Sequence, residues 1–314
     1  MGGTLVDLKD LLAMTKMMPD NEKIQDDSSV CAVCGIPLSG PVMVHFGGAR
    51  LIRCTTCGSW IYLPRPSAQE QVAIHDSADY FEHPYFQGRR RAKATLDRRC
   101  RETFARIGTE VNLESLRGER LLDVGCDTGS FLASAAEQFG IVPVGIDVSS
   151  HAVQEATKKG IETYHTNLET APSHLKDFTV ITAIDLIEHV AEPRAFLQQI
   201  FVRLRPGGVA YLETPNVRSM VYLAGRILCS VTGGWPRGTF ERLFPPQHAQ
   251  HFTCASFSAL VRECGFEVVQ LDTRVLPFDD IHTSLPVRIG MAGLQLLDSL
   301  TCGRILICAL LRRP

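Results

Sequence analysis

Residues 121–129 read LLDVGCDTG, and this stretch decides the fold. An apolar run ends in an acidic residue and a glycine turn, after which a helical pattern begins near Ser130. Gly125 and Gly129 let the backbone approach a ligand closely, because glycine has no Cβ atom. A dinucleotide-binding turn would show GxGxxG around a pyrophosphate, whereas the spacing here is GxxxG with Asp123 two residues ahead. This pattern favours a ligand that carries a cation and no phosphate.

A second acidic residue ends the next predicted strand, VPVGID. This residue, Asp147, lies 22 residues after Gly125. A carboxylate at this place in a doubly wound sheet can accept hydrogen bonds from both hydroxyls of a ribose. Asp123 and Asp147 could instead serve only the positive ends of the helices that follow them. We favour ligand binding, because both residues fall at the carboxyl ends of strands, where such sheets bind their ligands.

Short apolar runs and helical stretches alternate from residue 119 onward. The predicted helices lie near 130–139, 151–159, 193–204 and 256–264, and the predicted strands are RLLDVG, VPVGID, IETYHT, FTVITAID, VAYLET, FEVVQLD and RILICALL. This alternation indicates a Rossmann-like α/β fold, with a parallel sheet covered by helices on both faces. Insertions at 217–250 and 273–302 interrupt it, and both contain apolar stretches. Insertions after strand ends are where α/β folds build substrate sites.

A small cysteine module precedes this pattern. Two CxxC pairs, Cys31 with Cys34 and Cys54 with Cys57, are separated by 19 residues, and a glycine follows each pair. Four thiolates at this spacing predict a closed, structural Zn²⁺ site. Four unpaired core thiols are the alternative, but they do not explain the paired spacing. So short a module buries little apolar surface, and the metal would therefore supply most of its folding free energy.

These motifs together resemble those of the class I S-adenosylmethionine-dependent methyltransferases. The resemblance is carried, in family order over roughly 119–312, by LLDVGCDTG, VGIDVS, DLIEHV, RLRPGGVAYLETPN and QHAQHFTCASFSALVRECGF. The N-terminal part is similar to a subgroup in which a four-cysteine zinc module is followed by LPRPS and a Tyr-Phe pair. The resemblance implies a seven-stranded sheet whose last strand, in RILICALLRRP, is antiparallel to the rest, with a small zinc-ribbon module in front of it.

The resemblance also implies how the cofactor, S-adenosylmethionine, is held. Asp123 would face the methionine amino group, Asp147 would hold the ribose and Val148 would flank the adenine. Asn167 takes a position where the family often has an aspartate near the adenine amine, and Asp185 would lie beneath the sulfonium. The cofactor-binding residues implied in this way are Asp123, Gly125, Cys126, Asp127, Gly129, Asp147, Val148, Asn167 and Asp185.

Methyl transfer to a hydroxyl needs a base, and histidine suits neutral pH. Glu188 and His189 follow the fourth predicted strand, and His248 and His251 end the first insertion. These four are the catalytic candidates, although a histidine near a helix end can also be purely structural. In the family, DLIEHV is similar to the ExxEH of ubiquinone-pathway O-methyltransferases, whose acids and histidine can hold a divalent cation. This chain has Asp185 at the first of those positions.

An aromatic group in the segment before the sheet is a candidate wall for the acceptor pocket. It consists of Tyr80, Phe81, Tyr85 and Phe86, and Tyr80 is the candidate for a polar contact with the substrate. The alternative is that these rings only pack the segment onto the sheet.

The chain has 314 residues and a formal net charge of −2, which argues against a polyanion-binding protein as a whole. Residues 88–106 nevertheless carry eight bases and two acids. This segment should be helical, and it is either a solvated face, a contact for a sugar-nucleotide diphosphate or an RNA-binding surface. The apolar insertions could pack on the domain, cover an apolar acceptor, form a dimer contact or lie on a membrane surface.

Four segments are expected: a mobile leader at 1–29, the zinc module at 30–63, a linker with the basic segment at 64–118, and the methyltransferase domain at 119–314. The N-terminus does not resemble a secretory signal, and no apolar run is long enough for a transmembrane helix. Eleven cysteines without a signal fit a reduced, cytoplasmic setting.

The expected function is methyl transfer from S-adenosylmethionine to a small molecule. The favoured reaction is O-methylation of a sugar, a nucleotide-linked sugar or a natural-product hydroxyl. The alternatives are C-methylation of a sugar, methylation of RNA through the zinc module and the basic helix, and a non-catalytic adapter. Nucleic acid is disfavoured as a partner, and a homodimer is possible.

Overall fold

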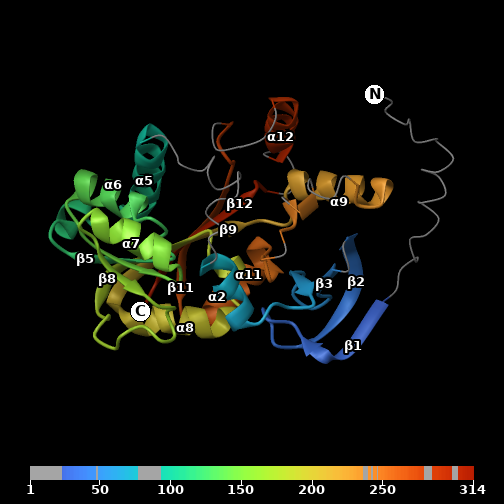
Figure 1. Ribbon diagram of the computed structural model, residues 1–314, viewed down its shortest axis with the longest axis horizontal. Helices are drawn as coiled ribbons and strands as arrows, with labels where there is room; N and C mark the ends of the chain where they lie inside the picture. The colour runs from blue at the N-terminus through green and yellow to red at the C-terminus, as the bar shows by residue number, and fades with distance from the viewer. Residues whose placement is uncertain are drawn as a thin grey trace.

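The computed structural model describes residues 23–46, 49–76, 93–235, 240–241, 243–245, 247–278, 285–298 and 303–314. Its strands form two sheets, one of seven strands and one of five. In Figure 1 the N-terminal strands of the smaller sheet lie beside the larger sheet and its helices.

The large sheet has the strand order β11–β12–β9–β8–β5–β6–β7. Its strands are β5 Arg120–Val124, β6 Val142–Asp147, β7 Glu162–His165, β8 Phe178–Ile184, β9 Leu204–Pro215, β11 Glu267–Arg274 and β12 Leu306–Arg312. The neighbours from β7 to β9 pair in parallel, whereas β12 lies between β9 and β11 and is antiparallel to both. The predicted seven-stranded α/β sheet with an antiparallel last strand is therefore confirmed.

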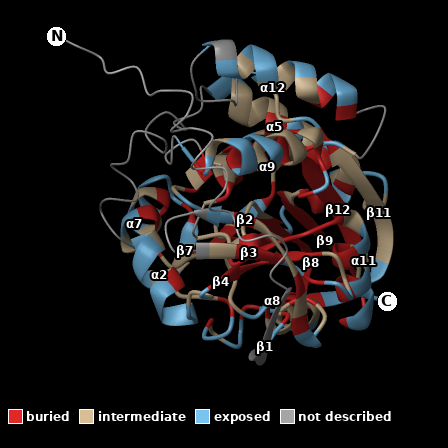
Figure 2. Ribbon diagram, turned by 90° about the vertical axis from the view of Figure 1, so that its right-hand side faces the viewer, coloured by how far each residue is buried: buried red, intermediate tan, exposed pale blue. Residues whose placement is uncertain are grey.

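Helices cover both faces of this sheet, as predicted (Figure 2). The main ones are α5 Lys93–Ile107, α6 Ser130–Phe139, α7 Ser150–Lys158, α8 Pro193–Arg203 and α11 Cys254–Glu263. Successive side chains on a strand point to opposite faces. Leu122 and Ile181 accordingly pack in one cluster with α8 and α11, while Leu121 and Val180 pack in another with α5 and α6.

The small sheet contains one strand from the large domain. Its order is β1–β2–β3–β4–β10, with β1 Lys23–Val30, β2 Pro37–Phe46, β3 Ala49–Arg53, β4 Trp60–Leu63 and β10 Gln250–His251. The Tyr62 N–H donates to the Ala249 carbonyl at 3.0 Å. The Ser59 hydroxyl donates to Ser256 of α11 at 2.8 Å. The cysteine module is thus joined to the large domain by backbone pairing and a buried side-chain contact.

Further helices come from the linker and the two insertions. These are α2 Ala68–Asp76, α9 Met220–Thr232 and α12 Leu285–Asp298, and short 3-10 turns cover Leu113–Leu116 and Ile187–His189. None of the described helices combines the length and the apolar character that a bilayer crossing needs.

The described part of the basic segment forms α5, and several of its cations are paired with acids of the domain. Lys93 Nζ lies 2.8 Å from a Glu137 carboxylate oxygen. Arg106 Nε lies 3.6 Å from Asp272. A third cation, Arg99, is buried. These three cations thus make contacts within the protein.

We predict that Phe104→Ala lowers the free energy of unfolding by about 3–5 kcal/mol. The Phe104 ring on α5 is fully buried and stacks on Phe139 of α6 with a centroid distance of 4.0 Å. Urea unfolding followed by circular dichroism gives the value. Val202→Ala on α8 is the control, since Val202 is 57% exposed and should change stability by under about 0.5 kcal/mol. Equal effects of the two changes would contradict the packing of α5 on α6.

Candidate functional site

The turn after β5, residues 123–129, is called the glycine elbow below. Gly125 and Gly129 have φ values of 73° and 71°, in the left-handed region that favours glycine. Gly129 is also hemmed in, because a Cβ atom there would lie 2.8 Å from the Ala156 Cβ and 2.6 Å from Ile161. Both glycines are therefore needed for the chain to turn from β5 into α6.

Two carboxylates lie at the carboxyl ends of adjacent strands beside the glycine elbow. Asp147, at the end of β6, accepts hydrogen bonds from the backbone N–H groups of Asp127 at 2.8 Å and Ser149 at 2.9 Å. Asp123 accepts one from the Thr182 hydroxyl at 2.6 Å. Burial raises the pKa of Asp147 to about 6 and that of Asp123 to about 7. Both side chains are thus poised for a ligand that supplies positive charge or hydroxyl donors.

A buried ion-pair network closes the same edge of the sheet. Arg99 of α5 contacts Asp185 at 2.8 Å and Glu213 at 2.5 Å. Arg274 of β11 grips Glu213 with two hydrogen bonds of 2.7 Å. Burial alone would raise the pKa of Glu213, but the two arginines outweigh it and hold that pKa below its ordinary value. The network places a guanidinium beside the carboxylate of Asp185, which was predicted to lie beneath the cofactor.

The remaining predicted cofactor residues lie around the glycine elbow or on neighbouring loops. The Cys126 side chain is buried against Gly145 of β6. The Val148 carbonyl lies 2.8 Å from the ring nitrogen Nε2 of His165. The Asn167 side chain accepts a hydrogen bond from the Thr170 N–H at 2.8 Å, so that it shapes its own loop. Their roles toward the cofactor remain predictions.

Three of the four predicted catalytic residues gather into one group, to which α2 adds a histidine. Ligand atoms of Glu188, His189 and His248 all lie within 4.8 Å of one another. The His189 ring meets those of His248 and His75 edge-on, with centroids 4.5 Å and 4.8 Å apart. Burial raises the pKa of Glu188 to about 8. The same carboxyl accepts a hydrogen bond from Thr214 at 2.8 Å.

The divalent-cation set suggested by the DLIEHV resemblance is divided in the structure. Asp185 turns to Arg99, whereas Glu188 and His189 join His248 of the first insertion. The group that could hold a metal ion here therefore contains a residue from the insertion in place of the first acid.

His251 lies deeper than the other candidates. Its side chain is 1% exposed, and neither ring nitrogen has a hydrogen-bond partner among the described residues. Burial lowers its pKa to about 3, so that the ring stays neutral at ordinary pH. His251 packs beside the ring of His248, with centroids 5.5 Å apart.

Tyr80, the predicted acceptor contact, lies outside the described residues.

Sequence reasoning missed Arg99 and His75. Arg99 belongs to the buried side of α5 together with Cys100, Phe104 and Ile107. A cation within the apolar stripe of an amphipathic helix is a usable signal, because a buried charge needs a partner. No comparable signal marks His75, whose place depends on how α2 packs.

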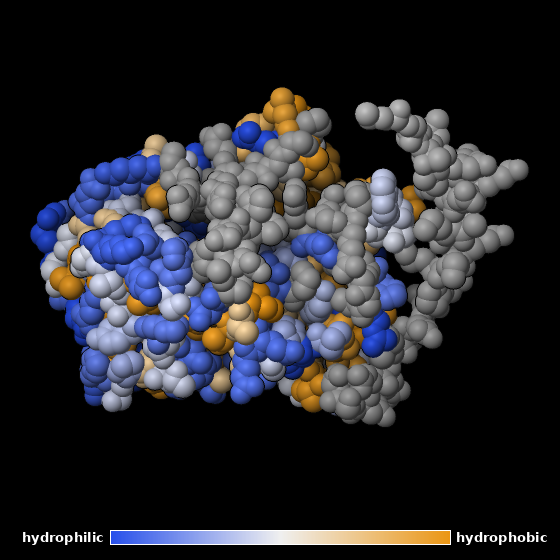
Figure 3. All heavy atoms as spheres, viewed as in Figure 1, coloured by the Kyte–Doolittle hydropathy of each residue, from blue (hydrophilic) through white to orange (hydrophobic). Residues whose placement is uncertain are grey.

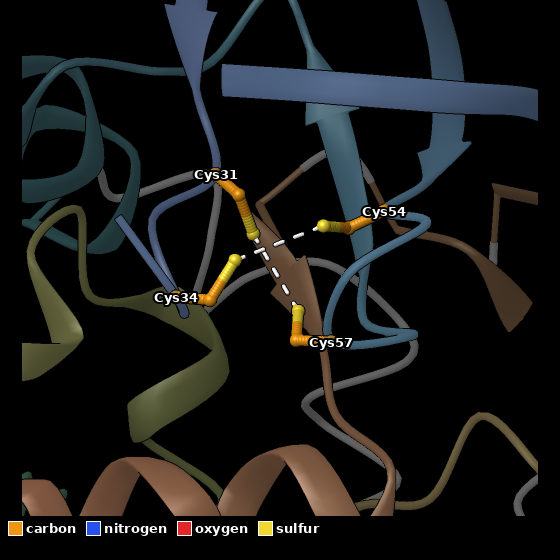
Figure 4. A group of neighbouring side chains, drawn as sticks. All are labelled: Cys31, Cys34, Cys54 and Cys57. Carbon is orange, nitrogen blue, oxygen red and sulfur yellow. Dashed lines mark hydrogen bonds between the residues drawn. The ribbon is translucent and has the colours of Figure 1, made fainter. Parts of the chain in front are cut away.

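The four cysteine side chains of the module point toward a common centre (Figure 4). The Sγ atoms of Cys31 and Cys57 are 3.7 Å apart, and those of Cys34 and Cys54 are 3.8 Å apart. A tetrahedron with Zn–S bonds of about 2.3 Å has S–S edges of about 3.8 Å. These two separations therefore match a closed zinc site, and all four Sγ atoms lie within 4.8 Å of one another.

Comparison with known proteins agrees with this geometry. The sequence profile of a family described as "Methyltransferase domain" matches residues 90–271, more than half of the chain. The ubiquinone biosynthesis O-methyltransferase of Psychrobacter arcticus is 35% identical over 161 residues, which cover 48% of this chain and 60% of that protein. The enzyme of the same name from Idiomarina loihiensis is 28% identical over 157 residues, covering 47% and 64%. The chain thus spans less than two thirds of these relatives.

A solved structure with a similar fold is phosphoethanolamine N-methyltransferase 2 of Haemonchus contortus, in complex with S-adenosyl-L-methionine. Its TM-score is 0.54 at 14% identity, covering 78% of this chain and 60% of that one, and this likeness concerns the fold alone. The strand order and the glycine elbow define a class I methyltransferase fold. With the profile match, the chain belongs to the methyltransferase-domain family.

We predict that Glu213→Gln destabilises the protein by about 3–5 kcal/mol, because it leaves two buried arginines without their shared charge. Thermal and urea unfolding measure the effect. Glu267→Gln is the control on the outermost strand of the same sheet, since the Glu267 side chain is 54% exposed and pairs with Arg312 at the surface. That pair should contribute only about 0–1 kcal/mol. A Glu213 variant as stable as the control would refute the network.

Proposed function

We propose that this chain transfers the methyl group of S-adenosylmethionine to an oxygen of a small-molecule acceptor. The observation that carries the proposal is the pair of carboxylates, Asp123 (buried) and Asp147 (partly buried), on adjacent strand ends beside the glycine elbow. The similarity to O-methyltransferases supports an oxygen acceptor. A hydroxyl of a sugar, a nucleotide-linked sugar or another natural product remains our expectation for its chemical class.

Three parts of the cofactor would have complementary groups at this edge of the sheet. Asp147 would accept hydrogen bonds from the ribose hydroxyls, and Asp123 would face the methionine ammonium. Arg99, which already pairs with Asp185 and Glu213, would add a cation near the methionine carboxylate. When bound, the cofactor supplies a methyl group already activated on a sulfonium. The protein then needs mainly to hold the acceptor in line with that methyl and to take up its proton.

His189 is the base that the arrangement favours. It adjoins the end of β8 and contacts His248, through which a proton could be passed on. His251 is a poor candidate for direct proton transfer, because its burial and low pKa disfavour the charged ring. Glu188, whose pKa is about 8, is largely protonated at neutral pH. In this neutral form it would not repel the nearby carboxylates of Asp185 and Glu213.

The basic helix gives RNA little support as an acceptor, since three of the five cations in its described part, Lys93, Arg99 and Arg106, have acidic partners in the protein. Cytoplasmic placement also stays a proposal, which rests on the reduced cysteines expected from the sequence.

The affinity for S-adenosylhomocysteine should fall as the pH drops from 8 to 5. Asp147 and Asp123 take up protons near pH 6 and 7 and then no longer accept hydrogen bonds as carboxylates. We expect a loss of about 10–100-fold, the range for hydrogen bonds to charged groups. Calorimetry at each pH measures it. Asp147→Asn should bind weakly and show a shallower dependence, and a pH-independent affinity in the parent protein would sink the assignment.

Replacing the base should slow methyl transfer and leave cofactor binding intact. His189→Gln is expected to lower kcat by about 10²–10⁴-fold while the dissociation constant of S-adenosylhomocysteine stays within about twofold. His45→Gln, at an exposed position of β2, is the control. The assay transfers labelled methyl groups to a panel of phenols, sugars and sugar nucleotides. Full activity of His189→Gln would move the base role to another residue.

We further propose that the four-cysteine cluster binds one structural Zn²⁺. Elemental analysis should find one zinc per chain, and Cys54→Ser should lose it and unfold at a lower temperature, since metal binding contributes folding free energy. Cys264→Ser is the control, because Cys264 is a buried cysteine at the C-terminal end of α11, outside the module. Zinc retained in Cys54→Ser, or absent from the parent protein, would count against the site.

A further inference from the structure

The helices of the two insertions, α9 and α12, expose apolar side chains that the proposed reaction does not use. We call this surface the α9–α12 face; its exposed members are Ile227, Leu228, Val231, Trp235, Leu285, Val287, Ile289, Leu296 and Leu297. Trp235 is 75% exposed and Leu296 is 73% exposed. Soluble proteins seldom expose so many large apolar groups together unless the surface binds something.

The exposed residues follow the helical period. Ile227 and Val231 are four residues apart on α9, and Trp235 continues that spacing just beyond its end. Leu285, Ile289 and Leu296 form a corresponding stripe on α12. The opposite sides of both helices are packed: Tyr222 of α9 is buried in a cluster that Met291 and Leu294 of α12 also contact. The helices are thus amphipathic, with one apolar side in the protein and another in solvent.

The two helices lie next to each other at one end of the molecule. Both ribbon views place α12 above α9 (Figures 1 and 2). In the space-filling view, hydrophobic residues gather at the top, where α12 lies (Figure 3). The apolar groups therefore belong to one region rather than to scattered positions.

The charges of this region are one-sided. Residues 216–235 contain Arg218 and Arg226 and no acid, and residues 285–298 contain Arg288 and a single acid, Asp298. Asp298 is 2% exposed and accepts a hydrogen bond from the Met220 N–H at the start of α9. Within residues 216–235 and 285–298, the face therefore presents arginine but no exposed carboxylate, in a chain whose overall charge is −2. Apolar groups with a cationic rim are complementary to a bilayer that contains anionic lipids.

The same helix α9 reaches the candidate site. The Tyr222 ring in its first turn lies 5.9 Å from the ring of His251, while its C-terminal half is exposed. One helix thus contributes its buried N-terminal turn to the surroundings of His251 and its exposed C-terminal half to the α9–α12 face.

We propose that the α9–α12 face docks on the surface of membranes that contain anionic lipids. Docking would bring the candidate site to acceptors that are dissolved in the lipid. This consequence rests on the proposed methyl transfer. The docking itself does not, because it is measured without cofactor or acceptor.

Sedimentation of the full chain with lipid vesicles tests the proposal. Vesicles of phosphatidylcholine with about 30% phosphatidylglycerol should carry the protein into the pellet, and pure phosphatidylcholine vesicles should carry much less. Salt at about 1 M should weaken the binding, since it screens the arginine–lipid attraction. Trp235 reports the contact directly: its emission should shift to the blue with anionic vesicles, while the buried Trp60, 6% exposed, should not change.

Matched variants separate the face from a general effect of added charge. The double variant Ile289→Glu with Leu296→Glu should reduce partitioning at least tenfold, with unchanged thermal unfolding because both positions are exposed. The double variant Arg218→Gln with Arg226→Gln should reduce binding to anionic vesicles alone. Val202→Glu is the control, being 57% exposed on α8, at the end of the molecule opposite α12 in Figure 1.

Four outcomes would overturn the proposal. They are absence of vesicle binding, equal binding to neutral vesicles, a loss in Val202→Glu as large as in the double variant, and a dimer in analytical ultracentrifugation that the Ile289→Glu, Leu296→Glu variant dissociates. The last would assign the face to a second copy of the chain. Failed methyl transfer with intact vesicle binding would contradict the proposed function and leave the docking standing.

Discussion

The reversal of strand order at β5 is the constraint on which the site depends. β6 and β7 lie on one side of β5, and β8 and β9 lie on the other. The connections consequently leave in opposite directions, and α/β sheets have their ligand-binding crevice at such a switch point, outside the carboxyl ends of the strands. Asp123 is buried there and Asp147 is partly buried, and removal from water raises the pKa of both carboxyl groups. A ligand with an ammonium and hydroxyl donors would offset that cost.

The surroundings of this crevice are assembled from distant parts of the chain. Glu213 holds arginines from α5 and from β11 in one network. The histidines come from α2, from the turn after β8 and from the end of the first insertion. β10, which carries His251, pairs with β4 of the cysteine module, so that loss of the module's fold would disturb the histidine cluster as well. The module is therefore part of the architecture of the site.

Local patterns predicted most of the fold, because each strand and helix of the sheet carries its own apolar period and the glycine elbow has a distinctive spacing. The same patterns could not show that Arg99 meets Glu213, which lies 114 positions further along. Nor could they show that Ser59 of the module contacts Ser256, 197 positions away. Such contacts depend on the packing of finished elements. The two-residue strand β10 is also too short to leave a periodic signal.

The central claim is that the crevice binds a positively charged sulfur nucleoside. Titration calorimetry of the unmodified chain with S-adenosylmethionine, and separately with NADH, tests it most directly. The account predicts saturable binding of one S-adenosylmethionine per chain and no binding of the dinucleotide. A folded protein that does not bind S-adenosylmethionine at millimolar concentration, or that binds NADH in its place, would contradict this claim.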